Sequence, residues 1–311
     1  MLLVHLSTFR TLGMLMLVAL VACKKEEVVV RPDNEAPDYD GVASVVVRNY
    51  VNRLFIDLLG REPVDAEMDA EVSALESASL SMEARTALVN KLMTSTAFVQ
   101  GDSSYQHAYA QRTYEQFKAR FIEGVSDDVI DGFIGNAAQA ALEDSLSGDA
   151  QGASESNSAL QRLLRLKSAR IHYREGTITG LEMAKRMMFN DVFDEINMNA
   201  FNFINASFDN LLFRFPTDAE FDAAYTMVEQ SAPALLFGQS AQNKGGYLDI
   251  LVNSAEGHEG LVRLFFRSYL GREPSTSEVF PILNAFMSDH DLRRMQRTIL
   301  VSDEYAGLQN S

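Results

Sequence analysis

Four histidines follow the first 23 residues, and their spacing decides whether the chain could hold a catalytic metal. They are His107, His172, His258 and His290. A zinc site in such a chain would show ligands four residues apart on one helix, or cysteine pairs in a short loop, and neither pattern occurs. The nearest groups, His258-Glu259 and Asp289-His290-Asp291, are expected at helix starts, where such residues cap or stay solvated. The histidines therefore predict no metal site.

A serine nucleophile or a phosphate loop would need a glycine framework that this chain lacks. Gly-x-Ser-x-Gly presents a nucleophile on a sharp turn, and neither Gly238-Gln239-Ser240 nor residues 148–154 complete it. Lys244-Gly245-Gly246 has neither the order nor the preceding strand of a phosphate loop, so we interpret it as a turn before a helix. We predict no catalytic residue and no cofactor.

Two helical stretches carry side chains that binding sites also use. One holds aromatic residues whose spacing fits a core face better than a ligand-stacking surface, although carbohydrate sites also use exposed tyrosines: Tyr105, Tyr109, Tyr114, Phe117 and Phe121. The other is basic, and is either a solvated helix face or a docking strip for an acidic partner or the protein's own acidic surface: Arg162, Arg165, Lys167, Arg170 and Arg174.

Cys23 is the residue whose surroundings predict a covalent modification. Residues 1–22 combine a basic Arg10 with an apolar run that is too short to span a bilayer, which is typical of a signal peptide. The ending Leu20-Val21-Ala22-Cys23 resembles a bacterial lipobox, and the chain has no other cysteine with which Cys23 could pair. We expect Cys23 to carry lipid such as palmitate, since each buried methylene contributes about 0.8 kcal/mol to membrane anchoring.

Residues 23–42 are expected to form a tether, because they contain two prolines, many charges and no helical period. Their start, Cys23-Lys24-Lys25-Glu26-Glu27, resembles the export tag of surface lipoproteins in the Bacteroidota. The other interpretation of these residues is simply a solvated start to the tether. The sequence thus predicts an outer-membrane lipoprotein and leaves open whether it is exposed at the cell surface.

The net charge of −16 limits the choice of partners. Nucleic acid and anionic lipid surfaces require a basic protein face, so both are disfavoured as electrostatic partners. An acidic surface suits an exported soluble domain, and it could also recruit cations or a basic partner.

A segment that occurs three times organises the rest of the chain, at residues 51–67, 204–220 and 262–278. Each copy has apolar residues at helical spacing, followed by Arg-x-Pro and a glutamate. The apolar positions form one stripe along a helix, and the proline cannot continue that helix. Each copy therefore predicts a long helix that ends at a corner.

We interpret the corners as structural, with a repeated binding role left open. Glycine suits the left-handed residue after a helix, whereas Phe213 in copy two predicts a different helix ending or a more buried corner. Each arginine is expected to bond the last carbonyls of its helix or to pair with a nearby carboxylate. The corner residues are Gly60, Arg61, Pro63, Arg214, Pro216, Gly271, Arg272 and Pro274.

Polar residues mark the start of each following helix. Thr217 with Glu220, and Ser275 with Glu278, have the spacing of capping boxes, whereas copy one has Val64 at this position, so Asp65 is expected to cap instead. Further downstream, Ser or Asn is followed three residues later by an aromatic ring that we expect in the core: Phe98, Phe193 and Tyr305. Ser254 lacks such a ring.

The distribution of Ala, Leu, Met, Glu and Arg predicts an all-α fold, an array of repeated helix-corner-helix units. The expected helices are 41–60, 65–78, 81–94, 103–123, 126–146, 157–173, 178–189, 192–213, 218–231, 246–254, 257–271, 276–288 and 290–301. Residues 145–158, rich in Ser and Gly, are expected to be a flexible loop between a helical domain at 43–144 and another at 159–308. The two could still share one core.

Residues 177–193 and 201–216 resemble the motif order of phycobilisome linker domains. They also resemble an exported bacterial repeat domain of unknown function with a Leu-Gly-Arg-x-Pro corner and a later Ser-x-Glu-Phe. Both families are helical, and neither has an assigned catalytic residue to transfer. The resemblance implies a packing module, so we expect a lipid-anchored envelope scaffold that binds another envelope protein. The alternative is an envelope enzyme or glycan-binding lipoprotein with a site of scattered carboxylates and tyrosines.

Overall fold

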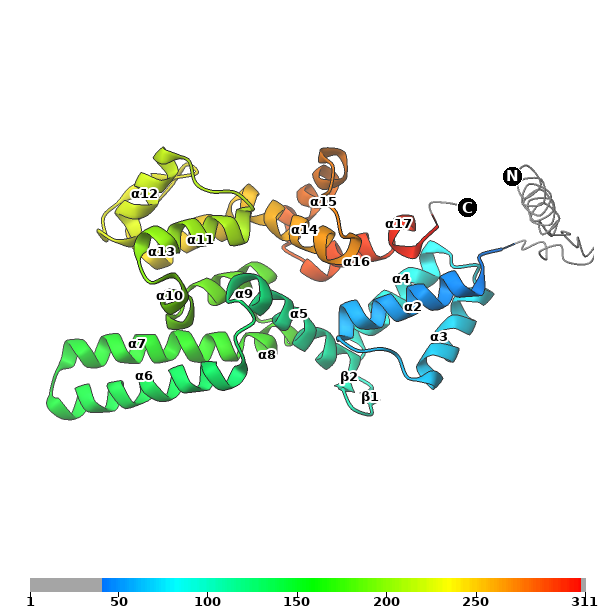
Figure 1. Cartoon of the computed structure of the whole chain (residues 1–311), viewed down its shortest axis with the longest axis horizontal. Helices are drawn as coiled ribbons and strands as arrows, with labels where there is room; N and C mark the ends of the chain where they lie inside the picture. Colours follow the sequence, from blue (N-terminus) through cyan, green and yellow to red (C-terminus); the bar gives the residue numbers. More distant parts are fainter. Residues whose placement is uncertain (1–40, 309–311) are drawn as a thin grey trace, which may run out of the picture. The chain divides into compact units, whose positions relative to one another are not determined.

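The chain folds into helices, as its composition predicts. The computed structural model describes residues 41–308, and sixteen helices and two short hairpins make up that part of the chain (Figure 1). The predicted signal peptide and most of the predicted tether, with Cys23, lie outside the described residues. None of the helices between residues 41 and 308 is long and apolar enough to cross a membrane.

The helices follow the predicted pattern closely. The first eight are α2 (Ser44–Leu59), α3 (Asp65–Ser77), α4 (Met82–Thr94), α5 (Tyr105–Phe121), α6 (Asp127–Ser147), α7 (Ala150–Lys167), α8 (Ala169–Arg174) and α9 (Gly180–Met188). The next eight are α10 (Asp191–Asn197), α11 (Ala200–Leu212), α12 (Asp218–Val228), α13 (Lys244–Asn253), α14 (Ala255–Leu270), α15 (Thr276–Asp289), α16 (Leu292–Leu300) and α17 (Asp303–Ala306).

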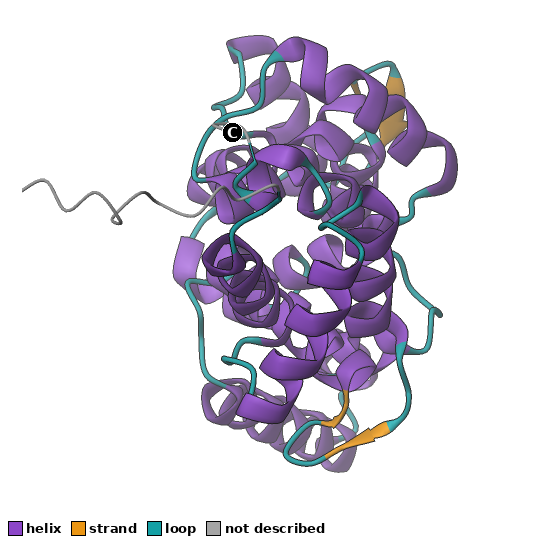
Figure 2. Ribbon diagram, turned by 90° about the vertical axis from the view of Figure 1, so that its right-hand side faces the viewer, coloured by secondary structure: helices purple, strands orange, loops and turns teal. Residues whose placement is uncertain are grey.

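Two antiparallel hairpins are the part of the fold that helical periodicity does not predict (Figure 2, orange). Strands β1 (Phe98–Val99) and β2 (Ser103–Ser104) connect α4 to α5, and β3 (Ala234–Leu236) and β4 (Gln239–Ala241) connect α12 to α13. Strands of two and three residues are too short to show an alternating pattern.

The repeated stripe forms the buried face of α2, α11 and α14. In α2 the stripe residues are buried, from Val51 to Leu59. All three helices end in the left-handed conformation, with φ of 76° at Gly60, 56° at Phe213 and 67° at Gly271. The prediction of a different helix ending in copy two is therefore wrong, whereas the more buried corner is confirmed, because Phe213 is half-buried and both glycines are exposed.

The helix after each corner begins as predicted in copies two and three. Thr217 and Ser275 are the N-caps, and the Glu220 and Glu278 carboxylates accept their backbone N–H groups. In copy one the prediction that Asp65 caps is wrong. Val64 occupies the cap position, and the Glu67 carboxylate accepts the Val64 N–H. The glutamate can thus make its half of the capping box without a hydroxyl partner.

The Ser-x-x-aromatic corners differ in their outcome. Asn190 and Ser302 cap α10 and α17, and the rings of Phe193 and Tyr305 are buried as predicted. The prediction for Phe98 is wrong, because its ring is 82% exposed. Phe98 begins strand β1, and alternation along a strand turns its side chain away from the core.

Two expected helices are each divided in two, at residues with competing local hydrogen bonds. The segment 192–213 breaks at Met198, which has a left-handed φ of 58°, and Asn199 then caps α11 by accepting the Asn202 N–H. The helix expected at 157–173 begins earlier, at Ala150, because the Asp149 side chain accepts the Gly152 N–H and so caps α7. It also breaks after Lys167, where α8 follows. Asn and Asp favour such caps over a continued helix.

The prediction of a flexible loop at 145–158 is wrong. Ser145–Ser147 belong to α6, residues 148 and 149 make the turn, and Ala150 begins α7. Small residues such as Gly152 and Ala153 allow the two helices to lie close together, and α6 and α7 pack chiefly against each other as one helical hairpin (Figure 1).

A single hydrophobic core connects both halves of the described chain. Helix α5 contacts α2 and α4 before the α6–α7 hairpin and α8, α9 and α11 after it. The aromatic residues of α5 are buried, so the prediction of a core face is confirmed: Tyr105, Tyr109, Tyr114, Phe117 and Phe121.

The long helices of copies two and three approach closely at a glycine. A methyl group on Gly260 in α14 would lie 1.7 Å from the Leu211 carbonyl oxygen in α11. The two backbones can therefore pack at this distance only if position 260 has no side chain.

We predict that Gly260→Ala lowers the free energy of unfolding by at least about 2 kcal/mol, because the methyl group forces α11 and α14 apart. Gly135→Ala is the control, since a methyl group there meets nothing within 4 Å, and alanine should stabilise that helix by up to about 1 kcal/mol. Urea unfolding of both variants is the measurement. Equal stability of the two variants would contradict the close approach.

Candidate functional site

The three corner arginines share one geometry. Each forms a two-pronged ion pair with the glutamate six residues later: Arg61 with Glu67 at 2.7 and 2.8 Å, Arg214 with Glu220 at 2.8 and 2.7 Å, and Arg272 with Glu278 at 3.0 and 2.5 Å. Two parallel N–H···O bonds fix orientation as well as adding energy. The arginine thereby holds the end of one helix to the start of the next.

Each arginine also reaches a third segment through its Nε. The acceptors are Asp102 before β2 at 2.7 Å, Glu256 in the first turn of α14 at 2.7 Å and Glu304 in the first turn of α17 at 2.6 Å. Glu256 and Glu304 each follow a capping serine by two residues. The corner arginine therefore ties one repeat unit to the corner that follows it.

Two further contacts complete each corner. The guanidinium donates to the carbonyl of the residue before proline, at Glu62, Phe215 and Glu273. It also lies 5.3 to 5.6 Å from the ring of the preceding repeat phenylalanine, within the range of cation–π attraction. Pro63 and Pro216 are half-buried and Pro274 is buried. The predicted pairing of these arginines with carboxylates is confirmed, and their donors are already occupied.

The ion pairs set the acidity of the corner glutamates. Burial alone would raise the pKa of Glu67, but hydrogen bonds from Arg61, the Val64 N–H and Tyr105 lower it to about 2. Hydrogen bonds from Arg214 and Arg272 lower the pKa of Glu220 and of Glu278 to about 2 as well. These carboxylates remain ionised at any physiological pH, so none can act there as a general acid.

We predict that the corners make the fold acid-sensitive. A carboxylate whose pKa falls from 4.5 to about 2 on folding contributes stability that is fully present above pH 4.5 and is lost as the pH falls toward 2. Glu220→Gln should therefore lose less stability than the wild type between pH 5 and pH 2.5, as measured by urea unfolding.

Glu76→Gln serves as the control for this prediction, since Glu76 is exposed and has no ion-pair partner among the described residues. Its acid dependence should match that of the wild type. If Glu220→Gln also matched it, the ion pair would carry no net stability.

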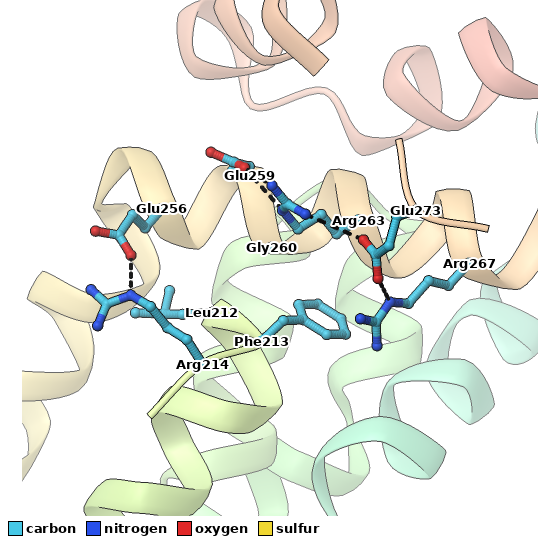
Figure 3. Close-up of a pocket in the computed structure, with 9 residues that line it drawn as sticks. All are labelled: Leu212, Phe213, Arg214, Glu256, Glu259, Gly260, Arg263, Arg267 and Glu273. Atoms are coloured by element: carbon cyan, nitrogen blue, oxygen red, sulfur yellow. Dashed lines mark hydrogen bonds and ion pairs between the residues drawn. The ribbon is translucent and has the colours of Figure 1, made fainter. Parts of the chain in front are cut away.

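The corner of copy two borders a surface hollow of about 490 Å³ (Figure 3). Phe213 forms its floor, and Arg120 and Arg267 lie over the ring at 4.2 and 4.4 Å. The remaining lining residues come mainly from α14. Copy two has Phe213 where the other two copies have glycine, and its ring connects the end of α11 to Arg120 on α5 and Arg267 on α14.

The charged groups around this hollow neutralise one another. Arg214 pairs with Glu256, Arg263 pairs with Glu259 and Glu273, and Arg267 also pairs with Glu273 (Figure 3). Three arginines and three glutamates therefore leave no net charge to attract an ionic ligand. The hollow is best explained as the solvent-exposed edge of the contact between α11 and α14.

The fold brings together two histidines that the sequence separates by 32 positions. His258 Nε2 lies 2.9 Å from His290 Nδ1, and His258 Nδ1 lies 2.8 Å from the Ser254 carbonyl oxygen. Because a carbonyl only accepts, His258 carries its proton on Nδ1, and His290 then donates to Nε2. The described residues contain no group of three or more His, Cys, Asp or Glu that could hold a metal ion.

We predict that the His258–His290 pair makes the free energy of unfolding decrease in mild acid. Burial lowers the pKa of His258, and the neighbouring His290 adds to this effect. In the unfolded chain His258 binds a proton as the pH falls below about 6.5, whereas in the folded chain it stays neutral to lower pH. The free energy of unfolding therefore decreases as the pH drops below that value.

Replacing His258 tests the origin of this effect. His258→Gln should flatten the loss of unfolding free energy between pH 7.5 and pH 5.5, as measured by urea unfolding. His107→Gln, at an exposed position on α5, should retain the wild-type slope. A retained slope in His258→Gln would assign the effect to other groups.

The basic strip mostly pairs with the protein's own carboxylates. Arg162 binds Asp191, Lys167 binds Asp131, and Arg170 binds Asp127, whereas Arg174 contacts His107 and Glu175. Of the three alternatives for this strip, contact with the protein's own acidic surface is the one that these ion pairs confirm. The interpretation of residues 244–246 as a turn before a helix is wrong, because they form the first turn of α13, and the Lys244 side chain pairs with Asp194.

A buried chain of polar side chains joins three tyrosines, Tyr109 on α5, Tyr173 on α8 and Tyr269 on α14, through Gln296. The Tyr109 hydroxyl lies 2.9 Å from the Tyr173 hydroxyl and donates to Gln296, whose amide donates to Tyr269 at 2.8 Å. Burial raises the pKa of Tyr109 to about 12. The hydroxyls bond with one another and with Gln296, and the rings are buried, so these tyrosines are not available for stacking on a sugar.

A larger hollow than the one beside Phe213 lies elsewhere, and the sequence does not point to it. It measures about 650 Å³ and lies between the α6–α7 hairpin and α10, where Phe133, Ala137, Ala140 and Ala159 meet the acidic residues of α10. The only sequence signal is that α6 is apolar on more than one face. The position of this hollow depends on how α10 packs against α6 and α7.

The chain matches no family model, no curated protein and no solved structure. The resemblance of residues 177–193 and 201–216 to linker domains and to an exported repeat domain therefore stays a prediction.

Proposed function

We propose that this protein is a lipid-anchored, non-catalytic interaction protein of the cell envelope. The lipobox-like residues before Cys23 and the tether-like composition up to residue 42 support an outer-membrane anchor, with the helical part on the cell surface. The all-α array beyond the tether then presents helix faces to another envelope protein.

The observation that carries the proposal is the incomplete covering of α6. This helix has many apolar residues, but only Ile130 and Ala141 are buried. Val129, Leu142 and Leu146 are 46%, 60% and 79% exposed. A helix that a fold leaves apolar and open to water marks an interaction surface.

The alternative of an enzyme or a glycan-binding protein has less support. The tyrosines of α5 lie in the core, and the lowered pKa values of the corner glutamates are opposite to those that a catalytic acid requires. The scaffold function is therefore the one that we propose.

The anchor has a direct test. Cells that express the full chain and are fed labelled palmitate should incorporate label into the protein, and Cys23→Ala should abolish the label and release the protein from the membrane fraction. Incorporation that survives Cys23→Ala would sink the lipoprotein proposal.

The scaffold function has a separate test. Pull-down from detergent-solubilised envelopes should recover the same protein repeatedly with the wild type, and less of it with Cys23→Ala, which is no longer held beside its partner. Failure to recover any reproducible partner would reject the scaffold function.

A further inference from the structure

Two hollows that share lining residues lie beside α10, and together they are called the opening. The larger one, of about 650 Å³, lies between α10 and the α6–α7 hairpin, and a second one, of about 240 Å³, lies on the side of α11 and α13. Asp194 and Met198 line both. The opening therefore follows α10 from the helical hairpin to α11.

Apolar residues that are only partly covered line this opening, together with the polar Asn136, Ser156 and Asn199. Phe133, Ala137 and Ala140 on α6 and Ala159 on α7 are half-buried. On the other side of Met198, Phe203 and Val228 line the smaller hollow. Small alanines beside larger apolar residues make a surface into which side chains of another helix can insert.

Met198 lines both hollows and has an unusual backbone conformation. Its φ is 58°, a left-handed value that costs a residue other than glycine about 1 kcal/mol or more. Its side chain is nevertheless 81% exposed. The flexible thioether can adapt to different apolar partners, as methionines on binding surfaces do.

Acidic side chains also line the opening. Asp191 and Asp194 have partners in Arg162 and Lys244, whereas Glu195 and Glu229 form no ion pair within residues 41–308. Lys244 is the one basic residue that lines either hollow. An occupant with basic side chains would therefore find two carboxylates that lack a counter-charge.

We propose that this opening binds an amphipathic helix of another protein, which places apolar side chains over Ala140 and Met198 and lysines or arginines beside Glu195 and Glu229. The inference rests on the proposed scaffold function and specifies the chemistry of its partner. A second copy of the chain is a poor occupant, because a net charge of −16 on each copy opposes their association.

The probe is a pair of synthetic 14-residue helical peptides, one of leucine and lysine and the other of leucine and glutamate in the same order. The full chain carries methyl-labelled methionine, and Met198→Leu assigns the signal of Met198 in the NMR spectrum. The lysine peptide should shift this signal in a saturable way. Met82, 55% exposed on α4, should not respond, and the glutamate peptide should shift neither signal.

Matched variants locate the binding. Ala140→Trp should fill the opening and weaken binding about tenfold or more, since each tenfold loss corresponds to about 1.4 kcal/mol, whereas Ala138→Trp, on the exposed side of α6, should have no effect. Glu195→Lys should weaken binding of the lysine peptide about threefold to tenfold. Glu143→Lys makes the same charge change at an exposed residue that lines neither hollow, and it should leave affinity near that of the wild type.

The outcomes separate this inference from the scaffold function. Equal binding of both peptides, or equal effects of Glu195→Lys and Glu143→Lys, would reject a basic helix as the occupant. Self-association in sedimentation that Ala140→Trp abolishes would reject it in favour of a second copy. Either result leaves the pull-down test of the scaffold function unaffected. If Ala140→Trp fails to fold, the comparison of Glu195→Lys with Glu143→Lys still tests the inference, because both substitutions are at exposed positions.

Discussion

The forked ion pair between the corner arginine and the glutamate six residues later is the interaction on which the helical array depends. A helix pair joined by a short turn has many possible crossing angles, and apolar packing selects among them only loosely. The guanidinium is planar and holds two helix ends and a third segment in one geometry. Its repetition at Arg61, Arg214 and Arg272 makes each unit define the position of the next.

The same corner tolerates variation where another contact compensates. Copy two lacks the glycine but retains the left-handed turn, and the ring of Phe213 is held between Arg120 and Arg267. Copy one lacks the capping hydroxyl, yet Glu67 still accepts the backbone N–H at that position. In both cases the arginine and glutamate stay, which indicates that the ion pair is the constant part of the corner.

Internal pairing of the basic residues also shapes the surface. Most arginines of the corners, of the basic strip and of the hollow near Phe213 have carboxylate partners within the fold. Acidic residues outnumber basic ones, 43 to 27, so pairing necessarily leaves unneutralised carboxylates. Those at Glu195 and Glu229 lie beside an apolar opening, and a basic helix is the partner that such a surface fits.

Local pattern determined most of the fold. Apolar stripes, capping residues and Arg-x-Pro predicted the helix positions, the core face of α5 and the structural corners, because these features depend on neighbours within one or two turns. The division of 192–213 at Met198 and the hairpin in place of a loop at 145–158 were missed. There the side chains of Asn199 and Asp149 cap new helices, and short-range pattern does not decide between competing caps.

The sequence alone determined an all-helical chain with three equivalent corners and a lipobox-like cysteine. Only the tertiary structure decided which third segment each corner arginine binds, that His258 meets His290, and that α10 and the α6–α7 hairpin leave an opening lined by apolar and acidic side chains. These features join residues far apart in the chain, so they depend on the packing angles between helices, which no local spacing encodes.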